Sequence, residues 1–124
     1  MFLDTHFLIA GTRAGTPAAL QVERWIIQGE PLHASAMAWA EYLSGPLLPT
    51  EEQASRAILH RIHPVDEATA ILGARLFNGT GRRARSLPDC LIAATAMLAR
   101  QPLATLNTAD FRPFIPFGLV LAGN

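Results

Sequence analysis

The sequence predicts an α/β fold with a mainly parallel sheet and helices on both of its faces. Short apolar segments of strand length alternate with longer segments of helical character, a pattern typical of parallel strands joined by crossover helices. Half of the 124 residues are hydrophobic and 16% are charged, which suits a chain that buries one compact core. Because no linker, repeat or low-complexity segment divides the chain, we expect residues 1–124 to form a single domain.

The first half of the chain contains two predicted strands, each followed by a helix. Thr16 and Pro17 form a typical helix start, with a hydroxyl cap and a proline in the first turn. Ser35 is expected to cap the next helix, which carries Glu41. The expected elements are a strand at 2–3, a helix from 5 to about 10, a break at 11–15, a helix from 16 to 29, a strand at 31–34 and a helix from 35 to about 45.

The second half of the chain repeats this alternation. The segment that begins at Pro88-Asp89 is apolar nearly all round, so the helix it predicts is expected to be central. The expected elements are a helix that opens at 50–52, a strand at 62–65, a helix capped by Asp66, a turn at 78–81, a basic loop at 82–85, a helix over 90–100 and strands at 103–105 and 118–122.

Composition limits the possible function and location. Ten arginines balance ten acids, and zero net charge argues against a protein that coats nucleic acid in general. The chain has no lysine, which excludes mechanisms that need a catalytic lysine. The single cysteine, Cys90, cannot form an internal disulfide, and neither a basic leader nor a membrane-spanning apolar run is visible. We therefore expect a cytoplasmic protein with no membrane segment.

Four acids occupy positions where a parallel sheet collects functional groups. Asp4 closes the first strand, Asp110 lies beyond the strand at 103–105, and Asp89 heads a helix. Glu41 is in an apolar helical stretch, where a carboxylate is unexpected unless positive charge compensates it. In parallel sheets such groups meet beyond the carboxyl ends of the strands, and oxygen-only ligands select Mg²⁺ or Mn²⁺ rather than zinc. Such ions can activate water and neutralise charge on a phosphodiester.

Four motifs that span nearly the whole chain resemble those of PIN-domain nucleases. They are Phe2-Leu3-Asp4-Thr5-His6-Phe7-Leu8-Ile9, Ala38-Trp39-Ala40-Glu41-Tyr42, the run from Leu87 to Ala96 that contains Pro88-Asp89-Cys90, and the run from Leu103 to Phe111. In its length and its lack of further domains, the chain is similar to the VapC toxins of bacterial toxin–antitoxin pairs. A departure from the common pattern is His6, which stands where asparagine is frequent.

The resemblance implies a PIN-like three-layer α/β/α sandwich and Mg²⁺- or Mn²⁺-dependent cleavage of RNA. It also implies a homodimer and inhibition by a small VapB-type antitoxin. Carried over by position, Asp4, Glu41 and Asp89 are the principal catalytic and metal-binding acids, and Asp110 completes the set. Thr5 and Asn107 are supporting polar groups.

Simpler interpretations remain open for several residues. Asp4 and Asp89 are also typical helix caps, and the segment from Asn107 to Asp110 also fits a turn stabilised by its own side chains. Arg82, Arg83 and Arg85 can form an ordinary solvated loop, or they can clamp RNA phosphates beside the cleft.

The four histidines show no zinc-ligand spacing with the cysteine, so packing or surface roles are expected, with His6 near enough to Asp4 to support the site. The main alternative function is a non-catalytic PIN-like module that binds RNA or protein. Phosphotransfer enzymes with acidic pockets usually need a lysine, which this chain lacks.

Overall fold

A four-stranded parallel sheet forms the centre of the protein. The computed structural model describes residues 1–81 and 86–123, and all structural statements concern these residues. The strands are β1 (Phe2–Leu3), β2 (His33–Ser35), β3 (Arg61–His63) and β4 (Leu103–Ala104). Their order is β3-β2-β1-β4, with every neighbouring pair parallel. The central strand β1 has Phe2 opposite both His33 and Leu103, so three distant segments meet at one register position.

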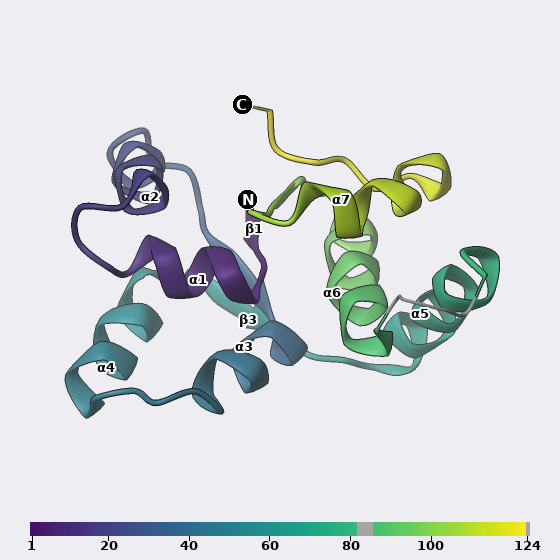
Figure 1. Cartoon of the computed structure of the whole chain (residues 1–124), viewed down its shortest axis with the longest axis horizontal. Coiled ribbons are helices and arrows are strands. Elements are labelled where there is room, and N and C mark those ends of the chain that lie inside the picture. The colour runs from purple at the N-terminus through teal and green to yellow at the C-terminus, as the bar shows by residue number, and fades with distance from the viewer. Residues whose placement is uncertain (82–85, 124) are drawn as a thin grey trace.

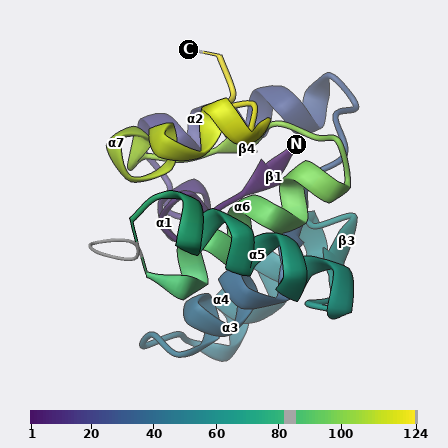
Figure 2. The ribbon, with the colours of Figure 1, turned by 90° about the vertical axis from the view of Figure 1, so that its right-hand side faces the viewer.

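Helices cover both faces of this sheet and produce the expected α/β/α architecture. The helices are α1 (Thr5–Gly11), α2 (Pro17–Ile27), α3 (Ala36–Leu43), α4 (Pro49–Ile58), α5 (Glu67–Gly79), α6 (Leu87–Leu98), α7 (Thr108–Phe111) and the 3₁₀ helix η1 (Arg112–Phe117). One side of the sheet carries α1, α2 and α4, and the other carries α5 and α6 (Figure 1). A quarter turn brings α5 to the front, with α6 behind it (Figure 2). None of the described helices is long and apolar enough to cross a membrane.

Local sequence explains where most helices begin. The Thr16 hydroxyl accepts a hydrogen bond from the Ala19 N–H at 3.0 Å, and Pro17 is the first residue of α2. Ser35 caps α3 in the same way through the Ala38 N–H, also at 3.0 Å. Asp66 caps α5, as expected.

The core lies on both sides of the central strands. Phe2, Leu3, Ala34 and Leu103 from the sheet are almost fully buried. The apolar helix α6 packs against β2 and α5 and contributes a run of buried residues from Ile92 to Ala96, which confirms its expected central position. A rigid core at the strands holds the loops that follow them in fixed positions.

Several predicted boundaries are wrong by one to three residues. The second strand is 33–35 rather than 31–34, the third is 61–63 rather than 62–65, and the fourth ends at 104 rather than 105. The helix predicted over 90–100 is α6 at 87–98, α1 extends to Gly11 into the predicted break, and α5 extends to Gly79 into the predicted turn. Capping decides the most consequential of these differences, because the Ser86 hydroxyl starts α6 three residues earlier than expected.

The predicted last strand at 118–122 is wrong. Gly118 has a φ of 113° and ends η1, a left-handed conformation that suits glycine. Only Leu121 then forms an isolated parallel bridge with Leu103. Two prolines within η1, Pro113 and Pro116, favour this tight 3₁₀ helix over an extended segment. The short helix α7, over 108–111, was not predicted.

Candidate active site

The four acids singled out in the sequence line a single pocket of about 240 Å³. They arrive from four separate segments: the end of β1, the middle of α3, the first turn of α6 and α7. Among the described residues, the lining is Asp4, Thr5, His6, Glu41, Asp89, Ile92, Asn107, Asp110 and Phe111. We call this the acidic pocket.

Asp4 is held in the acidic pocket by two hydrogen bonds, one made by its backbone N–H and one by its carboxylate. Its N–H donates to the Ala104 carbonyl at 3.1 Å, which ties it to the end of β4. Its carboxylate accepts from the Phe7 N–H at 2.8 Å, so it also caps α1. Only 2% of the residue is exposed. The cap interpretation and the pocket position are therefore both correct for this residue.

The environment of Asp4 disfavours its negative charge. Burial raises the pKa of its carboxyl above the ordinary value, and the neighbouring Asp89 carboxylate raises it further. Hydrogen bonds from Thr105 and the Phe7 N–H, together with the charge of His6, oppose this increase. A buried carboxylate that faces a second one is a group that a cation would stabilise.

Glu41 is joined to the segment of Asp4 by a short hydrogen bond. The Thr5 hydroxyl, next to Asp4 in the chain, donates to Glu41 Oε1 at 2.6 Å. This bond links the first turn of α1 to the middle of α3, and the two helices pack against each other. The half-buried Glu41 side chain is therefore held at the pocket rather than extended into solvent.

Asp89 is not the cap of its helix. That position belongs to Ser86, whose hydroxyl accepts from the Asp89 N–H at 3.2 Å. Asp89 lies in the first turn of α6, where the helix dipole favours a negative charge, and its side chain lines the acidic pocket.

Asp110 and Asn107 reach the pocket from the segment after β4. The Asp110 N–H donates to the Asn107 carbonyl at 3.0 Å, and the Asn107 N–H donates to the Thr105 hydroxyl at 2.9 Å. Asp110 is exposed, unlike Asp4 at the floor. The turn expected here is the start of α7, which directs both side chains toward the pocket.

Two other polar residues belong to this site. His6 lines the pocket, as its closeness to Asp4 indicated. The hydrogen bond from Thr105 to Asp4 was missed, although a hydroxyl directly after a parallel strand was a signal for it. Cys90 is buried in α6 and free of disulfides. The expected phosphate clamp of Arg82, Arg83 and Arg85 lies outside the described residues.

The donor set of the acidic pocket fits a hard divalent cation. Four carboxylates, a hydroxyl and an amide supply oxygen atoms, which Mg²⁺ and Mn²⁺ prefer. Among residues 1–81 and 86–123, no three side chains of metal-binding type already meet around one point. The fit therefore depends on the donor chemistry, the shared pocket and the disfavoured charge of Asp4.

Comparison with known proteins places the chain near one family. The PIN domain family model matches residues 1–113. A toxin–antitoxin complex from Klebsiella pneumoniae is similar at 27% identity and a TM-score of 0.65, over 89% of this chain and 88% of that chain. FitAcB from Neisseria gonorrhoeae is similar at 20% identity and a TM-score of 0.73, over 98% and 96% of the two chains. VapBC2 from Rickettsia felis, bound to a DNA fragment from its promoter, is similar at 17% identity and a TM-score of 0.74, over 98% and 96%. None of the curated protein sequences matches.

Proposed function

The chain belongs to the PIN domain family, and from this premise we propose that it is an Mg²⁺- or Mn²⁺-dependent endoribonuclease that hydrolyses RNA phosphodiester bonds. One observation carries the proposal: four acids from distant segments line the same pocket of about 240 Å³. Gathering like charges lowers stability unless a cation or a substrate uses them, so chance is a poor explanation of the cluster.

The residues of the acidic pocket have separate roles in this proposal. Asp4, Glu41 and Asp89 would hold the cation, with Asp110 at the exposed side completing the set. When bound, the cation supplies the positive charge that makes water a better nucleophile and stabilises the phosphodiester during hydrolysis. Thr5 keeps Glu41 oriented through its hydrogen bond, and Asn107 supplies a further polar group at the rim.

Hydrolysis without a covalent intermediate fits the described residues. The single cysteine, Cys90, is fully buried, and the chain has no lysine. Attack by water breaks one phosphorus–oxygen bond and leaves a phosphate on one RNA fragment and a hydroxyl on the other.

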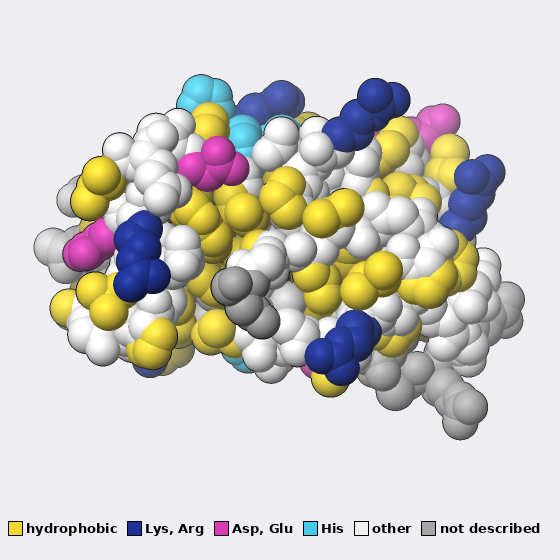
Figure 3. All heavy atoms as spheres, turned by 90° about the horizontal axis from the view of Figure 1, so that it is seen from above, with side chains coloured by type: hydrophobic (Ala, Val, Ile, Leu, Met, Phe, Trp, Pro, Cys, Tyr) yellow, Lys and Arg dark blue, Asp and Glu magenta, His cyan; other side chains and the backbone are white. Residues whose placement is uncertain are grey.

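The toxin of a type II toxin–antitoxin pair is the biological role that we propose for this activity. The similar structure from Klebsiella pneumoniae is by name a toxin–antitoxin complex, and the one from Rickettsia felis is by name VapBC2. Hydrophobic side chains spread over the face that carries α2 and the C-terminal segment, with arginines around them (Figure 3). Leu20 and Ile27 of α2 are 51% and 84% exposed, as expected of a surface that a partner protein covers. We propose a VapB-type antitoxin as the inhibitor, a homodimer as the working form and the cytoplasm as the location.

A cleavage assay tests the proposed activity. Purified protein is incubated with total RNA in Mn²⁺, in Mg²⁺ and in EDTA, and the ends of the fragments are mapped. We expect cleavage with either cation, none in EDTA, and none with Asp89→Asn. The matched control is Asp66→Asn, the same change at an exposed helix cap outside the pocket, which should retain activity.

Two outcomes would reject this function. Full cleavage in EDTA would exclude metal dependence. No cleavage together with saturable RNA binding and no Mn²⁺ binding would instead favour the non-catalytic module.

A further inference from the structure

We propose that His6 binds a phosphate group of the RNA at the mouth of the acidic pocket. The inference rests on the proposed function and assigns one substrate contact within it. His6 is exposed and lines the pocket together with the four acids.

The lining of the acidic pocket offers few hydrogen-bond donors to a phosphate beside the proposed cation. Its lining contains four carboxylates, and none of the described lining residues is an arginine or lysine. A phosphodiester carries a negative charge, and hydrogen-bond donors near the acids would position it beside the proposed cation. Among the described lining residues, the side chains that can donate are those of Thr5, His6 and Asn107.

Of these three donors, His6 is the best placed for a substrate. The Thr5 hydroxyl has one hydrogen, which it gives to Glu41 at 2.6 Å. Asn107 is half-buried, whereas His6 is exposed at the pocket rim. An imidazole has at least one N–H donor whether neutral or protonated, so the contact does not depend on the charge of the ring.

The backbone under His6 is rigid, which favours binding over a purely solvated role. The two residues after it, Phe7 and Leu8, are buried in the core. Asp4, two residues before it, is held by the Ala104 carbonyl and the Phe7 N–H. The ring therefore extends from a fixed first turn of α1. Imidazole is also a poor ligand for Mg²⁺, so contact with RNA suits His6 better than contact with the cation.

Replacing the ring with and without a donor tests the contact. His6→Phe keeps the size and removes the donors, while His6→Asn and His6→Gln keep an N–H. His60→Gln is the matched control, because His60 is an exposed histidine that does not line the pocket. Three quantities are measured: kcat and KM for a short RNA in Mn²⁺, the Kd for the same RNA in EDTA, and the Kd for Mn²⁺ alone.

We expect His6→Phe to raise KM and the Kd for RNA in EDTA about tenfold, the effect of a lost hydrogen bond to a charged group. Its kcat and Mn²⁺ affinity should stay within about twofold of wild type. The reason is that the lost contact stabilises bound RNA equally in the ground state and in the transition state. At least one of the amide variants should recover most of the RNA affinity, and His60→Gln should match wild type.

Unchanged KM and RNA affinity in His6→Phe would overturn the inference, and so would a loss of Mn²⁺ affinity. These outcomes differ from a failure of the proposed function, in which wild type does not cleave. In that case the EDTA binding comparison still decides the role of His6. A wild-type protein that neither cuts nor binds RNA would overturn both.

Discussion

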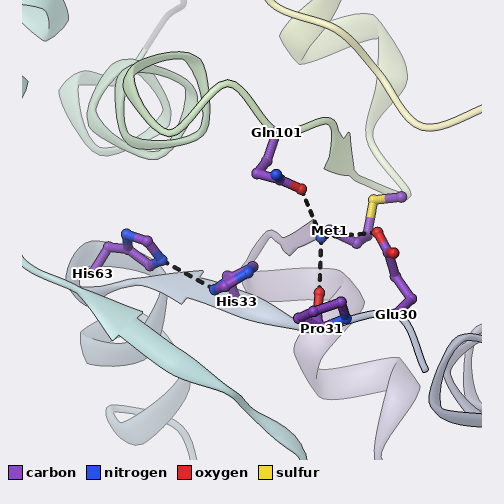
Figure 4. A network of polar contacts seen from close by, with 6 residues as sticks. All are labelled: Met1, Glu30, Pro31, His33, His63 and Gln101. Carbon is purple, nitrogen blue, oxygen red and sulfur yellow. Dashed lines mark hydrogen bonds and ion pairs between the residues drawn. The ribbon is translucent and has the colours of Figure 1, made fainter.

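The two ends of the sheet differ in whether their charged groups are compensated within the chain. At the carboxyl end, the acidic pocket gathers four carboxylates, and burial, with a further contribution from Asp89, raises the pKa of Asp4. At the amino end, a network of polar contacts joins Met1, Glu30, Pro31 and Gln101, with His33 and His63 beside it (Figure 4). The Met1 amino group donates to the Pro31 carbonyl at 2.9 Å and to Glu30 and Gln101 at 3.3 Å each. We call this set the amino-end network.

This difference separates stability from function within one small sheet. The amino-end network pairs a cation with a carboxylate and with neutral acceptors, so the chain itself satisfies its charges. The acidic pocket instead concentrates like charges, which costs stability until a ligand compensates them. Substitutions at the amino end should therefore change the free energy of unfolding, whereas substitutions in the acidic pocket should change activity.

Asp4→Asn is expected to have the largest effect, which is a loss of activity without a loss of stability. Loss of a principal acid should lower kcat by a factor of the order of 10²–10³, comparable to removal of one transition-state stabilising group. Asparagine is as good a helix cap as aspartate, and removal of a disfavoured charge should keep the free energy of unfolding equal or raise it. Cleavage rates and urea denaturation in EDTA measure the two effects.

Gln101→Ala at the amino-end network is the complementary control. It removes an acceptor of the Met1 amino group and should cost about 1 kcal/mol of stability without a change in kcat. If Asp4→Asn destabilised the protein more than Gln101→Ala did, the contrast between the two ends would fail.

Cation binding should stabilise the protein through the carboxyl end only. A ligand at a hundred times its Kd adds about 2.7 kcal/mol to the free energy of unfolding. Mn²⁺ should therefore raise the Tm of wild type and of Gln101→Ala alike, and leave Asp89→Asn unchanged. Thermal melts over a Mn²⁺ series measure this. An equal increase in Asp89→Asn would show that the cation binds elsewhere.

The hydrogen-bonded histidines His33 and His63 should make stability depend on pH. The pKa of His33 is lowered from 6.5 to about 4, mainly by burial and also by the positive Met1 amino group, His63 and His60, while Glu30 opposes the decrease. Burial lowers the pKa of His63 as well, with Arg61 and His60 adding to the effect.

A histidine with a lowered native pKa stabilises the fold while it is neutral. Stability is complete above the unfolded value of 6.5 and is lost as the pH falls toward 4, because the unfolded state binds the proton first. Because His33 is partly exposed, solvent screening should reduce the loss to about 1 kcal/mol. His33→Phe keeps an aromatic ring beside Phe2 and should flatten this dependence in urea denaturation at pH 7, 5.5 and 4. If the free energy of unfolding of His33→Phe depended on pH as steeply as that of wild type, other groups would be responsible for the dependence.

The sequence predicted the order of elements well because the signals are local. Thr16, Ser35 and Asp66 cap the helices that they were expected to cap. The end of the chain was harder, since the apolar residues after Gly118 look like a strand. Whether they pair is decided by η1 and by the position of Leu103, which no local pattern contains.

The candidate site, like the fold, was predicted only in part, because some of its contacts depend on packing between distant segments. The carboxyl-end rule for parallel sheets predicted in advance that all four acids meet at one edge, and the family resemblance then matched each of them to a motif. The bond between Thr5 and Glu41 joins residues 36 apart and required the packing of two helices. The His33–His63 hydrogen bond of 3.1 Å was missed for the same reason, since only strand pairing brings these residues together.

Thr5→Val is expected to have the smallest effect and to show how tightly the acidic pocket must be held. Valine has the shape of threonine without the hydroxyl, so it removes the 2.6 Å bond to Glu41 and leaves α1 intact. We expect kcat/KM to fall about tenfold, or ~1.4 kcal/mol, with half-saturation at a higher Mn²⁺ concentration, because Glu41 then loses orientation. Thr5→Ser keeps the donor and should match wild type in both measurements. If Thr5→Val also matched wild type, the packing of α3 alone would position Glu41. The hydrogen bond from Thr5 would then contribute nothing to activity at the carboxyl end.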